Sequence, residues 1–234
     1  MAPIQLLAFD LDGTLVDSVP DIARAVDLMA QELGLPPPDV GKVRIWVGDG
    51  VRRLVKRALT GEHDAEPPEE LYQHGMESFR RHYREHLADA TRLYPFALEV
   101  LNGLRSAGTQ LACITNKSAE FTEPLLQTLG LRDYFGVVLS GDSLERRKPD
   151  PLPLLHAART LRVAPTQSCM VGDSVNDMRA ARAAGFRAVA VTYGYGNAAE
   201  LATTAPDARL DSLAALPAWL AGQPAGLAGR AASR

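Results

Sequence analysis

Leu6-Leu7-Ala8-Phe9-Asp10-Leu11-Asp12-Gly13-Thr14-Leu15 is the stretch of this 234-residue chain from which the fold can be worked out. Its apolar beginning shows no helical period, which is typical of a parallel strand that is buried on both faces. The strand then ends abruptly in two acids, a glycine and a threonine. Parallel α/β sheets bind ligands beyond the carboxyl ends of their strands, where the loops are free. The stretch therefore predicts an α/β fold with its chemistry at the end of this strand.

The two acids at this strand end are candidate catalytic groups. Asp12 stands two residues beyond Asp10, near enough for one carboxylate to attack a substrate while the other handles a proton. Gly13 allows a tight turn close to an anion, and Thr14 offers a hydroxyl group. An ordinary Asx turn uses the same residue types, because Asp and Gly are common turn residues. The stretch alone leaves both interpretations open.

The composition excludes several classes of partner. Hydrophobic residues make up 46% of the chain, enough for a substantial core in one large or two small domains, and the formal net charge is -3. No basic stripe suited to nucleic acid or an acidic membrane surface is present. No apolar run reaches membrane-spanning length, and no secretory signal is visible, so we expect a cytoplasmic protein. Cys113 and Cys169 lie in apolar runs and are expected to be buried, reduced thiols.

The apolar pattern changes along the chain. Ser18 is predicted as the N-cap of a first helix, with Asp21 in a capping-box position, and two further helical patterns follow without an intervening strand. From about residue 94, helices and strands alternate, which implies βαβ units and a parallel sheet. We expect helices at 96–107, 120–129, 152–161 and 176–184, and strands at 110–114, 137–139, 168–171 and 188–191.

This order predicts an α/β protein with a Rossmann-like parallel sheet core and an inserted helical cap domain. The core would comprise residues 1–16 and 93–221, and the cap residues 17–92. Because the cap is inserted directly after the first strand, we expect it to open and close over Asp10. Residues 222–234 are small and biased in composition, so we expect a flexible tail there.

Three further strand ends carry polar residues that suit a phosphate. Thr115 and Asn116 offer a hydroxyl and an amide without adding negative charge. Lys148, whose backbone is restricted by the following proline, would present a fixed positive charge. Asp173 and Asp177 are four residues apart across a strand-to-helix turn, so both can point at one place. Each of these residues has a plausible structural role, but their shared position favours a site.

The acids also predict a metal cofactor. Together with a phosphate, Asp10, Asp12, Asp173 and Asp177 would place more negative charge in one crevice than Lys148 can balance. Oxygen ligands without a nearby histidine or cysteine select a hard cation. A site that keeps waters and a substrate phosphate as ligands favours Mg²⁺ over Ca²⁺. We therefore expect a magnesium-dependent protein.

These four segments resemble motifs I to IV of the haloacid-dehalogenase superfamily in order and spacing. The resemblance implies that Asp10 is the nucleophile that forms an aspartyl-phosphate. It implies that Asp12 protonates the leaving group and then activates water. Asp12 also argues against carbon–halogen chemistry, because dehalogenase members carry a different residue at that position.

The same resemblance implies roles for the other polar residues at the strand ends. It implies that the transferring phosphate is bound by Thr115, Asn116 and Lys148. It implies that Mg²⁺ is held by Asp10, Asp173 and the backbone carbonyl of Asp12, with Asp177 in support. Covalent catalysis of this kind splits one hard displacement into two easier ones.

The predicted cap carries a stretch that bears on the substrate. Trp46-Val47-Gly48-Asp49-Gly50-Val51-Arg52-Arg53-Leu54-Val55 resembles the specificity segment of bacterial phosphoglycolate phosphatases, and residues 148–151 and 191–196 resemble the same subfamily. The resemblance implies hydrolysis of the phosphomonoester 2-phosphoglycolate to glycolate and phosphate. A carboxylate substrate would need a cation from the cap, for which arginine has the better geometry. The candidate specificity residues are Arg44, Gly48, Asp49, Gly50, Arg52 and Lys56.

Other functions stay open. A phosphatase for a sugar phosphate, N-acetylmuramate 6-phosphate or pyrophosphate would share the same core. A β-phosphoglucomutase-like mutase is less favoured, since the chain has Ile22 and Gly48-Asp49-Gly50 where that branch carries a histidine and a different loop. A non-catalytic phosphate-binding protein is an alternative of another class, against which Asp10 and Asp12 argue. We expect a small phosphorylated metabolite as partner, no nucleic acid and no membrane; the oligomeric state is unknown.

Overall fold

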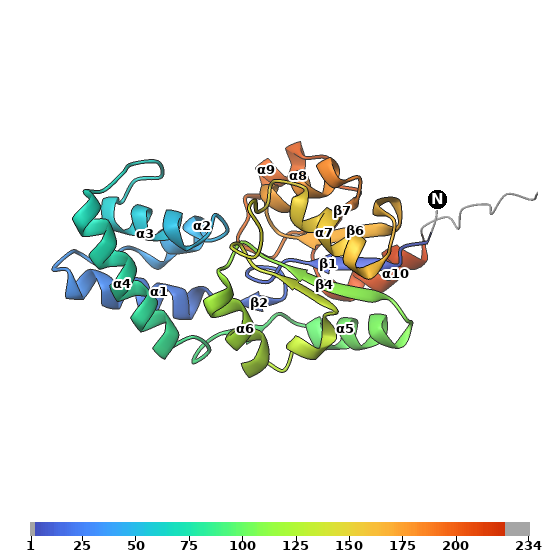
Figure 1. Ribbon diagram of the computed structural model, residues 1–234, viewed down its shortest axis with the longest axis horizontal. Coiled ribbons are helices and arrows are strands. Elements are labelled where there is room, and N and C mark those ends of the chain that lie inside the picture. Colours follow the sequence, from blue (N-terminus) through green and yellow to red (C-terminus); the bar gives the residue numbers. More distant parts are fainter. Residues whose placement is uncertain (1–2, 223–234) are drawn as a thin grey trace, which may run out of the picture.

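A parallel sheet forms the centre of the larger part of the molecule (Figure 1). The computed structural model describes residues 3–222. The sheet has six strands in the order β5-β4-β1-β6-β7-β8, and every neighbouring pair is parallel. Its strands are β1 (Leu6–Phe9), β4 (Gln110–Ile114), β5 (Val137–Leu139), β6 (Ser168–Gly172), β7 (Arg187–Val191) and β8 (Ala208–Leu210). The predicted α/β class with a Rossmann-like core is confirmed.

The position of β1 explains why its sequence is apolar throughout. It lies between β4 and β6, with Leu7 opposite both Leu111 and Cys169. All four residues of β1 have no exposed surface. Leu7 and Phe9 join one hydrophobic cluster, whereas the alternate residues join a second cluster on the other face. Burial of each large apolar side chain contributes about 2 kcal/mol, so this strand is fixed in the middle of two cores.

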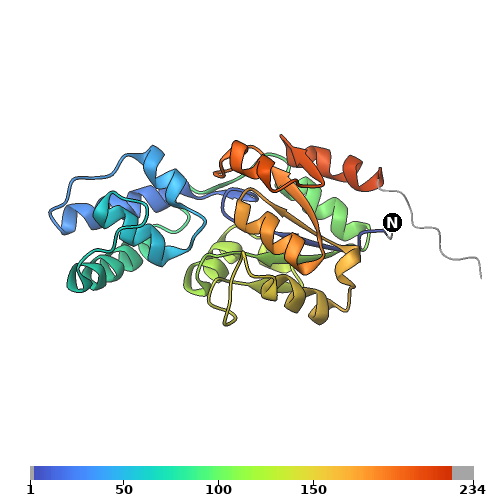
Figure 2. The same ribbon diagram turned by 90° about the horizontal axis from the view of Figure 1, so that it is seen from above.

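Helices cover both faces of the sheet (Figures 1 and 2). One face carries α5 (Ala97–Ser106), α6 (Ala119–Thr128) and α10 (Leu216–Ala221). The other face carries α7 (Leu152–Leu161), α8 (Val175–Ala184) and α9 (Ala198–Thr203). Short 3-10 helices are η1 (Arg132–Tyr134), η2 (Pro165–Gln167) and η3 (Leu213–Ala215). Cys113 and Cys169 are free and buried in this core, as predicted.

Four helices gather at one end of the molecule, away from the sheet (Figure 1). They are α1 (Val19–Glu32), α2 (Val40–Trp46), α3 (Val51–Thr60) and α4 (Glu69–Glu85). These helices share their own hydrophobic cluster, in which Met29, Val55 and Phe79 are buried. Phe121 of α6 also belongs to this cluster, so the helical part packs directly on the sheet part. We refer to these four helices as the cap.

The cap is joined to the sheet part by a short antiparallel ribbon. Its strands are β2 (Val16–Asp17) and β3 (Arg92–Leu93). The carboxylate of Asp21, which is 1% exposed, accepts hydrogen bonds from the backbone N–H groups of Ala90 and Thr91 and from the Thr91 hydroxyl. Asp21 therefore ties the start of the cap to its end.

One predicted feature at this junction is wrong. Ser18 is the N-cap of α1, but its side chain makes no capping hydrogen bond, and the predicted capping box with Asp21 does not form. The Ser18 hydroxyl donates to Asp12 instead, at 2.5 Å. The carboxylate of Asp21 is engaged by the other end of the cap. Tertiary partners have displaced the local interaction in both cases.

The predicted boundary between core and cap falls in the β2–β3 ribbon, and the division into two domains stays our interpretation. Most of the predicted tail, residues 223–234, lies outside the described part of the chain. Within residues 3–222, no helix combines the length and the apolar character needed to cross a membrane.

Candidate active site

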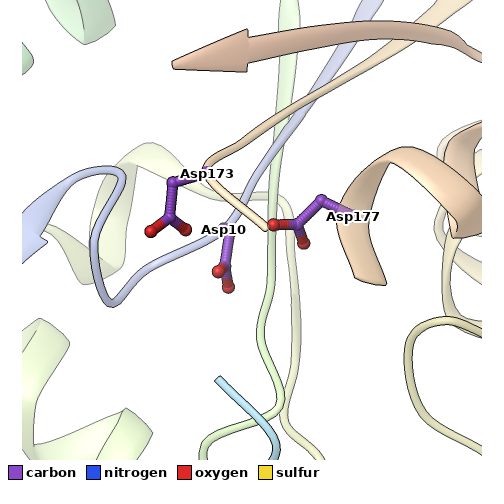
Figure 3. A group of neighbouring side chains, drawn as sticks. All are labelled: Asp10, Asp173 and Asp177. Carbon is purple, nitrogen blue, oxygen red and sulfur yellow. The ribbon is translucent and has the colours of Figure 1, made fainter. Parts of the chain in front are cut away.

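Polar residues from separate segments meet at the carboxyl edge of the sheet. Asp10 directly follows β1, Asp173 directly follows β6, and Asp177 lies in the first turn of α8. Figure 3 shows the Asp10 and Asp173 side chains running side by side, with that of Asp177 directed toward them from the start of α8. One carboxylate oxygen from each lies within 4.8 Å of the others, and all three residues are buried. The sequence prediction that these acids share one place is therefore correct in geometry.

Lys148 brings a positive charge into this acidic cluster. Its Nζ donates hydrogen bonds to Asp177 Oδ1 at 2.6 Å and to the carbonyl of Ile114 at 2.5 Å. It also lies 2.8 Å from Asp10 Oδ1 as an ion pair, without hydrogen-bond geometry. Burial opposes the charged form, but the Asp10 and Asp177 carboxylates outweigh burial and hold the pKa of Lys148 above its ordinary value. Lys148 is thus a permanent cation beside Asp10.

One lysine does not neutralise three buried acids. Burial raises the pKa of Asp10 to about 8, although Lys148 acts in the opposite direction. Burial, followed by repulsion from Asp177, raises the pKa of Asp173 to about 7. Both carboxyl groups are therefore poorly stabilised as anions in the protein alone. A bound cation would relieve this repulsion.

The two acids that follow β6 are held in fixed orientations. Asp177 Oδ2 accepts hydrogen bonds from the N–H group and hydroxyl of Ser174, which completes a capping box at the start of α8. Asp173 Oδ2 accepts hydrogen bonds from the N–H groups of Tyr195 at 2.6 Å and Gly196 at 3.3 Å. Asp177 therefore stabilises the start of α8 and also belongs to the acidic cluster.

Gly13 is required by the close approach of this cluster. Its φ is +84°, in the left-handed region that favours glycine. A Cβ atom at this position would also overlap the Asp173 carboxylate. The glycine in the sequence therefore serves the site directly.

Asp12 lies beside the cluster and has different partners. Its Oδ1 accepts hydrogen bonds from the Ser18 hydroxyl at 2.5 Å and from Lys117 Nζ at 3.1 Å. Lys117 Nζ also donates to the hydroxyl of Tyr83 on α4, at 2.6 Å. No role for Lys117, or for Ser18 as a partner of Asp12, follows from the sequence. The only signal was the position of Lys117 directly after Thr115 and Asn116.

A small cavity of about 50 Å³ lies between the cap and the sheet edge. A larger hollow of about 730 Å³, between α5 and α10, contains none of the predicted site residues, so the chemistry and not the size identifies the site. The residues that line the small cavity are Asp10, Asp12, Thr115, Asn116, Lys117 and Ser118 from the sheet side, with Phe121, and Ile22, Val47, Gly48, Gly50, Val51, Leu54, Phe79 and Tyr83 from the cap.

The predicted phosphate-binding residues Thr115 and Asn116 both line this cavity. The Thr115 hydroxyl accepts a hydrogen bond from the N–H of Lys117 at 3.2 Å. The Asn116 side-chain amide donates to the carbonyls of Gly48 and Lys148, each at 3.0 Å. Asn116 therefore links the cap loop to the Lys148 segment, and its role as a phosphate ligand stays a prediction.

The predicted specificity residues of the loop before α3 fall in two places. Gly48 and Gly50 line the cavity. Asp49 does not line it; its Oδ1 accepts a hydrogen bond from Asn176 at 3.0 Å, and its Oδ2 pairs with the buried Arg57 at 2.8 Å. Asp49 thus joins the cap to the segment that also carries Asp173 and Asp177.

The three predicted cations of the cap do not line the cavity. Arg44 donates to the carbonyl of Gly194 at 3.0 Å, and its guanidinium lies 4.8 Å from the centre of the Tyr195 ring. Lys56 pairs with Glu66, and Arg52 is exposed. A contact of Arg44, Arg52 or Lys56 with the substrate stays a prediction.

The donor set of the acidic cluster fits a hard cation. Within residues 3–222, Asp10, Asp173 and Asp177 form the one group of three or more acidic, histidine or cysteine side chains close enough to share an ion. All of its donor atoms are carboxylate oxygens, which suit Mg²⁺ or Ca²⁺ and not zinc or copper. The Asp12 carboxylate does not belong to this group. Only its backbone carbonyl remains as the predicted ligand from that residue.

Comparison with known proteins places this geometry in a family. A family model described as haloacid dehalogenase-like hydrolase matches residues 4–185. A phosphoglycolate phosphatase of Nitrosococcus oceani is 47% identical over 209 residues, which cover 89% of this chain and 93% of the relative. One of Chromobacterium violaceum is 48% identical over 213 residues, covering 91% and 95%.

A solved structure shows the same fold over nearly the whole chain. The crystal structure of a predicted phosphoglycolate phosphatase from Haemophilus somnus 129PT superposes with a TM-score of 0.88 at 34% identity. The match covers 94% of this chain and 99% of that structure. The similarity therefore includes the cap as well as the sheet.

Proposed function

The chain belongs to the haloacid dehalogenase-like hydrolases and is a phosphoric monoester hydrolase, and we propose that it hydrolyses 2-phosphoglycolate to glycolate and phosphate in a Mg²⁺-dependent reaction. One observation carries the proposal. The carboxylate of Asp10 and that of Asp12 border one small cavity, and Lys148 lies 2.8 Å from Asp10. A nucleophile and a second carboxyl group thus face the same cavity, and a fixed cation lies directly beside the nucleophile.

In the first half of the reaction, an Asp10 carboxylate oxygen attacks phosphorus. The bond from phosphorus to the substrate oxygen breaks, and the carboxyl group of Asp12 gives its proton to that oxygen. The products are an acyl phosphate on Asp10, an Asp12 carboxylate and glycolate. Lys148 stays charged throughout and stabilises the negative charge near the transferring group.

In the second half, water replaces Asp10 on phosphorus. The Asp12 carboxylate accepts one proton from the water, whose oxygen bonds to phosphorus as the acyl phosphate bond breaks. Asp10 returns as a carboxylate, Asp12 is protonated again, and hydrogen phosphate is released. Each carboxyl group therefore ends the cycle in its starting form.

The residues that would hold Mg²⁺ are Asp10, Asp173 and the backbone carbonyl of Asp12, with Asp177 in support. When bound, Mg²⁺ supplies a positive charge that offsets the negative charge of the phosphoryl group. Fit to this ion is supported by the pKa values of Asp10 and Asp173, which burial and repulsion from Asp177 raise to about 8 and about 7. A cation would favour the ionised Asp10 that attack requires.

The choice of 2-phosphoglycolate rests on the cavity and on the relatives. The cavity is small and closed on one side by the cap, which favours a short leaving group over a sugar. Gly50 is the N-cap residue of α3, which begins at Val51, and no side chain accepts a hydrogen bond from the N–H groups of the first turn. Gly48, Gly50 and Val51 line the cavity, so this helix start lies beside it. Helix starts of this kind favour anions such as carboxylates. Relatives at 47% and 48% identity are named phosphoglycolate phosphatases.

The proposal is tested by phosphate release from a panel of substrates, with Mg²⁺ and with excess chelator. The panel contains 2-phosphoglycolate, hexose phosphates, pyrophosphate and N-acetylmuramate 6-phosphate. We expect kcat/KM to be highest for 2-phosphoglycolate and activity to disappear with the chelator. A higher kcat/KM for another phosphate would show that 2-phosphoglycolate is not the preferred substrate, without contradicting the roles of Asp10 and Asp12. No hydrolysis of any phosphate would contradict the proposed function.

A further inference from the structure

We propose that Lys117, itself held by Tyr83 of the cap, is the residue that positions the carboxyl group of Asp12 for proton transfer to the leaving group. This inference rests on the proposed function, because it concerns the same reaction. It adds two positioning residues, Lys117 and Tyr83, whose hydrogen bonds lead to Asp12.

The contacts of Asp12 single out Lys117. Lys117 Nζ lies 3.1 Å from Asp12 Oδ1 and 3.3 Å from Oδ2, and the Ser18 hydroxyl also donates to Oδ1. Oδ1 therefore holds two hydrogen bonds, and Oδ2 has only the longer contact. The carboxyl group is fixed in one orientation, in which Oδ2 is the oxygen left to carry the proton. The side chains of Lys117 and Asp12 are 5% and 10% exposed, so water does not screen their contact.

Tyr83 fixes the ammonium group of Lys117 in turn. The Tyr83 hydroxyl accepts a hydrogen bond from Nζ at 2.6 Å, and Nζ lies 4.7 Å from the centre of the ring. The ring itself has little freedom. Its centre is 4.8 Å from that of Phe121 and 5.5 Å from that of Phe79, and the residue is 2% exposed. A rigid aromatic cluster thus sets the position of a flexible lysine.

The two buried lysines of the site have separate tasks. Lys148 contacts Asp10 and Asp177, where the phosphoryl group is transferred. Lys117 pairs with Asp12 and lines the cavity, which Lys148 does not. A competing role for Lys117 is binding of the substrate carboxylate, since it also lines the cavity. The two roles make different predictions for kcat and KM.

The test compares two kinds of leaving group in Lys117→Met. This change keeps most of the side-chain length and removes the charge. An alkyl phosphate, taken as the best substrate of the panel, releases a basic alkoxide that needs a proton. p-Nitrophenyl phosphate releases a stable phenolate that needs little help. General acid catalysis contributes about 100-fold or more, and kcat/KM reports only the steps up to formation of the acyl phosphate on Asp10, before water enters. We therefore expect kcat/KM for the alkyl phosphate to fall about 100-fold and that for p-nitrophenyl phosphate by less than about 5-fold.

Two milder variants follow the same pattern if the inference is correct. Tyr83→Phe keeps the ring and removes the hydroxyl, so we expect the same selective loss at about 10-fold. Lys117→Arg restores a cation and should recover part of the alkyl phosphate activity. The matched controls are Lys42→Met, at an exposed position of α2, and Tyr72→Phe, on the same helix as Tyr83 and outside the cavity. Both controls should leave the ratio of the two activities unchanged.

Other outcomes overturn the inference. Equal losses of kcat/KM with both leaving groups would show a general structural role for Lys117. A higher KM for the alkyl phosphate at unchanged kcat would show that Lys117 binds the substrate carboxylate. A crystal structure of Lys117→Met provides a readout apart from activity: we expect the Asp12 carboxyl group to turn while Asp10 and Asp173 stay in place, and an unmoved Asp12 would contradict the inference. A wild-type protein without phosphatase activity overturns the proposed function, which the other outcomes leave intact.

Discussion

At the residue scale, burial of Asp10 has two opposing effects on its reactivity. Its burial makes it a poorly solvated and therefore reactive anion, and the same burial raises its pKa to about 8. Lys148, 2.8 Å from Asp10, lowers the pKa of Asp10, whereas Asp177 and Asp173 raise it further. The residue is thus arranged for reaction at the expense of the stability of the metal-free protein.

The first prediction concerns replacement of this nucleophile. Asp10→Asn keeps the shape of the side chain and removes the atom that forms the acyl phosphate, so we expect kcat to fall by about 1,000-fold or more. The neutral amide also removes one buried carboxylate, while Lys148 keeps its bonds to Asp177 and Ile114. The melting temperature of metal-free Asp10→Asn at pH 8 should therefore be no lower than that of wild type. Phosphate release and thermal melts measure both effects, and unchanged turnover would rule out Asp10 as the nucleophile.

The second prediction concerns pH. The pKa values of Asp10 and Asp173 in the folded protein, about 8 and about 7, lie above the ordinary value near 4 of an unfolded chain. The folded protein therefore holds protons that the unfolded chain releases, and its stability falls as pH rises from about 4 through about 8. Bound Mg²⁺ favours the ionised carboxylates and should oppose this fall.

Thermal melts with chelator and with Mg²⁺ measure this effect between pH 6 and pH 8.5. We expect the metal-free melting temperature to decline across this range, and the increase caused by Mg²⁺ to be larger at pH 8 than at pH 6. Asp10→Asn serves as the control, because one of the two titrating groups is gone and the decline should be smaller. A metal-free melting temperature that rises with pH would contradict the prediction.

At the scale of elements, the strands and helices that are long and well buried are the ones that the sequence predicts correctly. The strands at 110–114 and 137–139 and the helix at 152–161 have their predicted bounds, because strands buried on both faces and amphipathic helices leave clear patterns. The elements missed are short: β2, β3 and β8 have two or three residues, and α9 and α10 have six. Segments of that length carry too few residues to show a period. The seven-residue α2, begun by Asp39 after a run of prolines, was missed for the same reason.

The same division applies to the site. Asp10, Thr115 and Asp173 could be placed together because each directly follows a strand, and a strand end has a known place in a parallel sheet. The expected strand-end position of Lys148 is wrong: it lies in the long loop between β5 and α7, and that loop brings it back to Asp10. Lys117 and its partner Tyr83 could not be predicted, since their meeting depends on how the cap packs on the sheet, which no local pattern records.

The start of α1 gives a third prediction at this scale. The Tyr195 hydroxyl accepts hydrogen bonds from the N–H groups of Ser18 at 2.7 Å and Val19 at 3.2 Å, and it lies 2.8 Å from Asp17 Oδ1. A tyrosine distant in sequence thus takes the place of the side-chain cap that Ser18 does not supply. Loss of a helix cap costs about 1 kcal/mol, so Tyr195→Phe should lower the free energy of unfolding by about 1–2 kcal/mol.

Denaturant unfolding of Tyr195→Phe measures this loss. The matched control is Tyr134→Phe, because the Tyr134 hydroxyl bonds to Asn102 at an exposed position. That change should cost less than about 0.5 kcal/mol, as is usual for exposed sites. Equal losses in the two variants would show that the Tyr195 hydroxyl does not cap α1.

At the scale of the whole molecule, the cap and the sheet part meet through the apolar packing of Phe121 in the cap and through a set of polar contacts. These contacts include Arg44 to Gly194, Gly48 to Asn116, Asp49 to Asn176 and Tyr83 to Lys117, and two exposed arginines of α4 that pair with Glu120. A single hydrogen bond of this kind contributes about 1 kcal/mol, and the covalent links are limited to the β2–β3 ribbon. Such a junction can separate and close again without unfolding either part. The predicted opening and closing of the cap is consistent with this arrangement.

The last prediction is that a phosphate analogue holds the cap closed. The only two cysteines of the chain, Cys113 and Cys169, are buried and unreactive because burial raises their pKa values. Fluorescent labels can therefore be placed at Lys42→Cys on the cap and Arg179→Cys on α8, both exposed positions. We expect a broad distribution of label distances in the free protein and a narrow, short one with Mg²⁺ and vanadate, because the analogue contacts groups on both sides of the cavity. Asp10→Asn, which lacks the nucleophile, should respond less, and a wild-type distribution that vanadate leaves unchanged would show that the cap is not a lid.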